Sequence, residues 1–276
     1  MVKEWQNPET LKSWLVGASA KVSADDARVL LTETLGISLT QLYLDPDRKI
    51  PQDWLEALSL RLERRIQGEP VAYIVGRQGF WSLELEVNRH TLIPRADTET
   101  IVSAALDGLK TIRGPSVLDL GTGSGAIALA IAHERKDAHV IATDSSEDAL
   151  DVARRNADRL GIRNVEFRYG SWFEAVEPGM QFDAIVSNPP YIRENDPHLD
   201  ALGFEPITAL TSGLDGLNDI RSIVTASRDH LTQGGSLLIE HGFDQGAQVR
   251  ELLRDFSNVR TLTDFGGNER VTIGQI

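Results

Sequence analysis

Between residue 116 and the C-terminus, short apolar runs alternate with longer amphipathic segments, and few folds accept such a pattern. The apolar runs predict seven strands, at residues 116–120, 138–143, 164–168, 182–186, 236–240, about 259–264 and 269–275. Helices are expected between them, at residues 125–135, 146–160, 217–231 and 244–256. Because strands that alternate with helices form parallel sheets covered on both faces, we predict a doubly wound, mainly parallel α/β domain.

The first seventy residues show helical periodicity and no strand pattern. Four helices are expected there, beginning at Asn7-Pro8, Ser23, Ser38 and Pro51. Gly68-Glu69-Pro70 interrupts the last of them and marks a boundary. We therefore predict a small helical bundle in front of the α/β domain.

A strand pattern of period two lies between these parts, where Trp81, Leu83, Leu85 and Val87 alternate with polar residues. We predict a hairpin with a first strand at 80–87, a turn near residues 88–90 and a return strand at 91–93. The expected division of the chain is then a helical domain, a hairpin linker and an α/β domain, at residues 1–73, 74–94 and 95–276.

The charge of the chain is acidic and unevenly distributed. The formal net charge is −13, and the 9 basic and 11 acidic residues of positions 1–70 leave 19 basic and 30 acidic residues for positions 71–276. Tight, sequence-independent binding of nucleic acid depends on Lys and Arg side chains that neutralise phosphates. The sequence therefore argues against such binding, and we expect no direct nucleic-acid partner.

Several other kinds of chemistry are disfavoured by residues that the chain lacks. It contains no cysteine, which excludes disulfides and makes structural zinc unexpected. The six histidines show no metal-ligand spacing such as His-Glu-x-x-His, so we expect no metal. No apolar run approaches membrane-spanning length, and the first residues lack the apolar stretch of a signal peptide. We expect a cytoplasmic chain with no membrane contact, and a monomer.

A glycine-rich segment, Asp119-Leu120-Gly121-Thr122-Gly123-Ser124-Gly125, joins the first predicted strand to a helix, where open parallel sheets bind ligands. With Asp144 further on, its spacing also fits a dinucleotide fingerprint. Asp119 favours another ligand, because its carboxylate would repel a pyrophosphate. S-adenosylmethionine carries an ammonium and a sulfonium group instead, which suit an acidic pocket. Asp144, at the end of the next strand, is placed to accept hydrogen bonds from ribose hydroxyls.

Two further segments are expected at the same edge of the sheet. Trp172 follows the third strand, and we predict that its ring lies against the adenine of the cofactor. The fourth strand ends abruptly at Asn188-Pro189-Pro190-Tyr191. Prolines have no N–H, so this stiff turn presents carbonyl oxygens, one carboxamide and one aromatic ring. Such a turn is suited to hold a planar NH2 group, which leaves a nucleic-acid base and a side-chain amide equally possible.

Taken together, these motifs resemble those of the class I S-adenosylmethionine-dependent methyltransferases and, more closely, of the peptide chain release factor glutamine methyltransferases. The closer similarity rests on residues 70–76, 80–99, 119–125, 188–191 and 265–270, and so covers nearly the whole chain. One departure is Ala96, where a proline is expected.

The resemblance implies methylation of the glutamine side-chain amide nitrogen in the Gly-Gly-Gln loop of class I release factors. It further implies that S-adenosyl-L-methionine is converted to S-adenosyl-L-homocysteine. The expected cofactor-binding residues are Asp119, Gly121, Thr122, Gly123, Ser124, Gly125, Asp144, Trp172 and Asn188. Asn188, Pro189, Pro190 and Tyr191 would hold the glutamine, with Asn188, Pro189 and Tyr191 taking part in catalysis. The helical domain would recognise the substrate.

The alternative is a methyltransferase that acts on an exocyclic amine of adenine or guanine in nucleic acid. Such an enzyme should show a basic face and a base-flipping insert, and this chain shows neither. A binding module that keeps the fold without catalysis is disfavoured by the intact Asn188 turn. The roles of Arg95, Glu99, Glu205 and Arg270 stay open between ion pairs that brace the site and contacts to the substrate.

Overall fold

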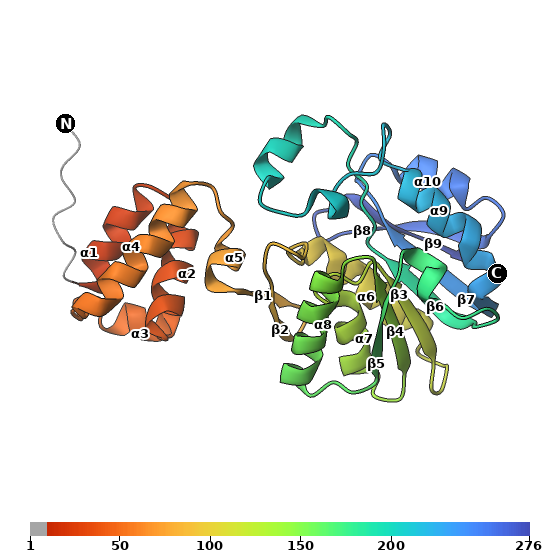
Figure 1. Cartoon of the computed structure of the whole chain (residues 1–276), viewed down its shortest axis with the longest axis horizontal. Coiled ribbons are helices and arrows are strands. Elements are labelled where there is room, and N and C mark those ends of the chain that lie inside the picture. The colour runs from red at the N-terminus through yellow and green to blue at the C-terminus, as the bar shows by residue number, and fades with distance from the viewer. Residues whose placement is uncertain (1–9) are drawn as a thin grey trace. The chain divides into compact units, whose positions relative to one another are not determined.

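A computed structural model describes residues 10–276 of the chain (Figure 1). These residues form two compact units, and the division falls between Gly76 and Arg77. The two-stranded hairpin belongs to the second unit. The three-part division expected from the sequence stays a prediction.

The N-terminal unit is helical, as predicted, with one short helix more than expected. Its helices are α1 (Leu11–Ser19), α2 (Ala24–Leu35), α3 (Leu39–Leu44), α4 (Gln52–Ile66) and α5 (Val71–Val75). The hydroxyls of Thr10, Ser23 and Ser38 cap the first three by accepting a backbone N–H from the first turn. The expected start at Asn7-Pro8 lies outside the described residues. The core of this unit includes the fully buried Trp14, Leu30 and Leu58.

The hairpin prediction is wrong in its pairing. Strand β1 (Arg77–Phe80) pairs antiparallel with β2 (Leu83–Glu86), so the turn lies at Trp81-Ser82, and residues 91–93 form no strand. Trp81 takes a positive φ of 56°, as the first residue of this two-residue turn. Its backbone N–H donates to Glu99 Oε1 over 2.8 Å, and its indole N–H donates to Glu134 Oε1 over 2.8 Å.

The second unit contains the predicted sheet of seven strands. They are β3 (Ser116–Leu120), β4 (His139–Asp144), β5 (Val165–Tyr169), β6 (Phe182–Ser187), β7 (Leu231–Glu240), β8 (Ser257–Thr263) and β9 (Glu269–Gln275). Their spatial order is β5-β4-β3-β6-β7-β9-β8. The first five in this order are parallel, and β9 runs antiparallel to both of its neighbours. The doubly wound, mainly parallel fold is confirmed.

Helices cover both faces of the sheet (Figure 1). One face packs against α6 (Glu99–Gly108), α7 (Ala126–Glu134) and α8 (Glu147–Leu160). The other packs against α9 (Asn218–Ser227) and α10 (Gly246–Leu252). Successive residues of the central strands point to opposite faces of the sheet. Val117 packs in the hydrophobic core under α6, α7 and α8, and Leu118 packs in the core under α9 and α10.

The register of the two central strands determines where the site forms. Leu120 at the end of β3 lies opposite Ser187 at the end of β6, and the Ser187 hydroxyl donates to the Leu120 carbonyl over 2.8 Å. The next residues along each strand, Gly121 and Asn188, therefore leave the sheet side by side. Within residues 10–276 no helix is both long and apolar enough to cross a membrane.

Candidate active site

A cavity of about 320 Å³ lies at the carboxyl ends of β3, β4 and β6. It is lined by the turn before α6, the glycine-rich loop, the start of α8, the segment after β5, the Asn188 turn and a loop near residue 206. Of the predicted site residues, those that line it are Gly121, Thr122, Gly123, Ser124, Asp144, Trp172, Asn188 and Pro190. Asp119, Gly125, Pro189 and Tyr191 lie outside the lining.

The glycine-rich loop needs glycine for two physical reasons. Gly121, Gly123 and Gly125 all have positive φ, at 73°, 57° and 84°, a region that other residues rarely adopt. A Cβ at Gly121 would lie 3.2 Å from Cζ3 of Trp172, and one at Gly125 would lie 2.9 Å from Cδ1 of Leu129. The loop therefore turns tightly and brings bare backbone to the cavity.

Asp119 lies beneath this loop and is fully buried. Its Oδ2 accepts hydrogen bonds from the Thr122 hydroxyl over 2.7 Å and from the Ala128 N–H over 3.2 Å. Its Oδ1 has no hydrogen-bond partner among the described residues. Burial raises the pKa of Asp119 to about 7, and the nearby charge of Asp144 adds to the effect. A positive ligand charge near this carboxyl would favour its ionised form.

Asp144 ends β4 and braces the loop from the other side. Its Oδ2 accepts the Gly123 N–H over 2.8 Å, and its Oδ1 accepts the Ser146 N–H over 2.9 Å. Burial raises the pKa of this carboxyl, and hydrogen bonds from the backbone of Gly123, Ser146 and Ser145 oppose the rise. A carboxylate offers about four lone-pair sites, so with these three donors it can still accept a further donor from the cavity.

Trp172 reaches the cavity from the segment after β5. Its backbone φ is 48°, and its carbonyl accepts the Thr143 hydroxyl over 3.2 Å. The ring lies directly over Gly121. This arrangement gives the cavity a flat apolar wall beside the glycine-rich loop.

Asn188 lines the cavity and carries a carboxamide there. Its Nδ2 donates to the Thr98 hydroxyl over 3.3 Å, while its Oδ1 accepts no hydrogen bond from residues 10–276. The oxygen is therefore available to an NH2 donor in the cavity. Pro189 and Pro190 are buried, and the Tyr191 hydroxyl lies 3.5 Å from Oε1 of Glu240.

Glu240, which the sequence did not indicate, lies behind the Asn188 turn at the end of β7. It is fully buried, which raises its pKa to about 7, and its Oε2 has no partner among the described residues. Arg270 contributes positive charge nearby and pairs with Asp97 and Asp264 at 3.2 and 3.1 Å. Arg270 therefore belongs to an ion-pair network behind the site.

The loop near residue 206 is held to the segment before α6 by Glu205. The Glu205 side chain is 3% exposed, pairs with Arg95 and accepts the Ile93 N–H over 3.0 Å. The sequence predicted neither this loop nor the turn at 89–92 as cavity walls. Glu205 was the one residue of this loop that the sequence singled out, but its partner Arg95 lies 110 residues away in the chain, so the contact could not be derived from spacing.

Comparison with known proteins identifies the family. A family model described as a methyltransferase domain matches residues 113–261, and one described as the PrmC N-terminal domain matches residues 13–76. The release factor glutamine methyltransferase of Pseudomonas aeruginosa is 52% identical over 254 residues, which cover 91% of each chain. That of Aliivibrio fischeri is 49% identical over 91% of this chain and 89% of its own. The chain belongs to the release factor glutamine methyltransferase family.

This membership confirms the resemblance inferred from the sequence. The fold is shared more widely. A methyltransferase from Pyrococcus furiosus has a TM-score of 0.52 at 22% identity, over 79% of this chain and 98% of its own.

Proposed function

We propose that the chain transfers a methyl group from S-adenosyl-L-methionine to the side-chain amide nitrogen of a glutamine. The substrate is the glutamine of the Gly-Gly-Gln loop in class I peptide chain release factors. Family membership supports this reaction. The structural observation that carries it is the free Asn188 oxygen on the cavity, next to the glycine-rich loop.

The residues present fit the cofactor. The glycine-rich loop offers a cradle that a Cβ at Gly121 would obstruct, and Asp144 offers acceptors for ribose hydroxyls. The orphaned Oδ1 of Asp119 adds negative potential where a cationic ligand is expected. When bound, S-adenosyl-L-methionine supplies an electrophilic methyl group on a sulfonium.

An amide nitrogen is a poor nucleophile because its lone pair is delocalised into the carbonyl. Asn188 Oδ1 would accept one hydrogen of the substrate NH2 group. The carbonyl of Pro189, which lies outside the lining but between the lining residues Asn188 and Pro190, would accept the other and help to orient the nitrogen. Alignment of reacting groups can supply roughly 7–11 kcal/mol at best. Acceptor oxygens also stabilise the positive charge that develops on nitrogen. The proton leaves after transfer, so the chain needs no general base.

Further proposals concern the rest of the molecule. The N-terminal helical unit grips a second region of the release factor, and the enzyme acts as a cytoplasmic monomer that binds neither nucleic acid nor membrane. If removal of residues 1–70 left efficiency on intact release factor unchanged, the role of this unit would be disproved.

The decisive experiment incubates the protein with labelled S-adenosyl-L-methionine and either release factor or duplex DNA. We expect label in the release factor alone. Label that entered only DNA would favour the base-amine alternative, which shares the Asn-Pro-Pro-Tyr turn.

A further inference from the structure

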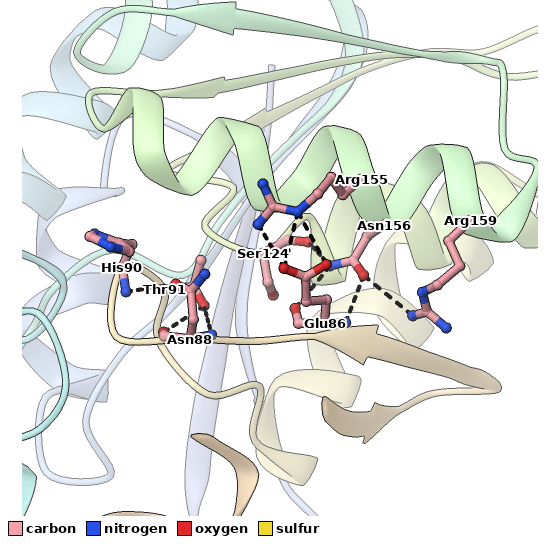
Figure 2. Close-up of polar contacts among 8 residues, drawn as sticks. All are labelled: Glu86, Asn88, His90, Thr91, Ser124, Arg155, Asn156 and Arg159. Atoms are coloured by element: carbon pink, nitrogen blue, oxygen red, sulfur yellow. Dashed lines mark hydrogen bonds and ion pairs between the residues drawn. The ribbon is translucent and has the colours of Figure 1, made fainter. Parts of the chain in front are cut away.

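Asn156, on α8, is fully buried and bonds both to the glycine-rich loop and to strand β2 (Figure 2). Its Nδ2 donates to the carbonyl of Ser124 in the glycine-rich loop over 3.0 Å and to the carbonyl of Glu86 in β2 over 3.0 Å. Its Oδ1 accepts the Glu86 N–H over 2.6 Å. One carboxamide therefore connects the loop to the hairpin.

These bonds leave only one possible orientation of the Asn156 amide. Both N–H groups of the side chain point at carbonyls, and its oxygen also accepts from Arg159 over 3.3 Å. Each donor and the acceptor is thus used. The bond to Ser124 is buried, so its loss would leave that carbonyl unpaired away from water, while the two bonds to Glu86 are partly buried.

The hairpin leads directly into a second wall of the cavity, the turn at residues 89–92. This turn is closed on itself, since Asn88 accepts the His90 N–H on its side chain over 2.9 Å and the Thr91 N–H on its carbonyl over 3.0 Å. His90 lies 3.3 Å from Asp148 in the first turn of α8 (Figure 2 shows the turn). The turn therefore contacts the start of α8, and strand β2, which precedes the turn, is bound to the same helix through Asn156.

We propose that Asn156 is a positioning residue for the cofactor site, although it does not line the cavity. It sets the spacing between the glycine-rich loop at Ser124 and the turn at 89–92, and so keeps the site in its binding-competent arrangement. This inference depends on the proposed function in one respect, which is that the ligand of the cavity is S-adenosyl-L-methionine. A site that holds its competent arrangement for a smaller fraction of the time binds its ligand proportionally more weakly.

The test compares Asn156→Asp with Arg155→Ala. Aspartate keeps the shape and the acceptor but loses both donors. Arg155 joins the same helix to the same strand, through the Glu86 carboxylate at 2.6 Å, and has no bond to the glycine-rich loop (Figure 2). It is therefore a matched control.

We expect Asn156→Asp to raise the Kd for S-adenosyl-L-methionine in calorimetry by roughly tenfold to a hundredfold, the equivalent of one or two lost buried hydrogen bonds. The kcat at saturating cofactor should stay within about threefold, and Arg155→Ala should leave the Kd within about twofold. An unchanged Kd in Asn156→Asp, an equal rise in Arg155→Ala, or a fall in kcat alone would overturn the proposal.

Hydrogen exchange without ligand provides a second readout that depends on no cofactor or substrate. Backbone amides at 121–126 should exchange faster in Asn156→Asp, or in Asn156→Ser if the aspartate variant does not fold by circular dichroism. Unchanged exchange in a folded variant would refute the positioning role. If the unaltered protein failed to bind S-adenosyl-L-methionine, the proposed function would fail, and the exchange data would still decide the role of Asn156.

Discussion

Replacing Asp119 by Asn should make the protein more stable at alkaline pH while it weakens cofactor binding. The native pKa of Asp119 is raised from 3.8 to about 7 because the carboxyl is fully buried. Between these two values the native state holds a proton that the unfolded state has released. The contribution of Asp119 to the unfolding free energy is therefore fully present below pH 3.8 and is lost as the pH rises towards 7.

The magnitude follows from the two pKa values. Each pKa unit corresponds to about 1.4 kcal/mol, so the ionised carboxyl costs about 4 kcal/mol of stability above pH 7. Asparagine removes this cost. The asparagine oxygen can still accept hydrogen bonds from Thr122 and Ala128. Its NH2 group would take the place of the unpartnered Oδ1 and would lack an acceptor. This unpaired donor would lower the stability of the variant by about 1–3 kcal/mol at every pH.

The assay is urea denaturation of the unaltered protein and Asp119→Asn at pH 5 and pH 8. The unfolding free energy of Asp119→Asn minus that of the unaltered protein should be about 3 kcal/mol larger at pH 8 than at pH 5. Asp158→Asn, at an exposed position of α8, is the control and should show almost no such change. The Kd for S-adenosyl-L-methionine should rise roughly tenfold at pH 8 in Asp119→Asn and less at pH 6, where the native carboxyl is mostly protonated. A stability difference that is equal at both pH values would refute the buried-acid account.

Other substitutions test separate parts of the site. Asn188→Ala should reduce methyl transfer by at least about a hundredfold without a large change in melting temperature, and retained activity would remove the central role given to this residue. Trp172→Ala should weaken S-adenosyl-L-methionine binding by roughly tenfold, because the flat wall over Gly121 is lost; an unaltered Kd would mean that the ring does not contact the cofactor. Glu205→Ala should cost about 1–3 kcal/mol of stability by leaving the Ile93 N–H unpaired. Glu205→Gln keeps an acceptor and should cost less, and equal losses in chemical denaturation would contradict this explanation.

The sheet and its binding edge could be predicted because their signals are local. Buried strands such as β6 are short and mainly apolar, and Pro189 with Pro190 ends that strand at a fixed residue. The strand-helix alternation then orders β3 beside β6 and brings Gly121 and Asn188 together.

The remaining walls of the site depend on contacts between distant residues. Trp81, which the sequence placed within a strand, lies in the hairpin turn, where its backbone and indole N–H groups bond to acids on α6 and α7. The sequence offers a weak signal for Asn156, because its spacing places it on the same face of the helix as Ala149, Val152 and Ala153, which are all buried. A polar residue on an apolar stripe suggests a buried hydrogen-bonding role, but its partners cannot be derived from spacing alone.

The most direct test of the central claim is to locate the transferred methyl group. Release factor that has been incubated with the protein and S-adenosyl-L-methionine would be digested and sequenced by tandem mass spectrometry. We predict a single methyl group on the side-chain amide of the glutamine in the Gly-Gly-Gln loop, and none when that glutamine is replaced. Methylation at another residue, or of nucleic acid alone, would contradict the assignment of the Asn188 turn as a glutamine site.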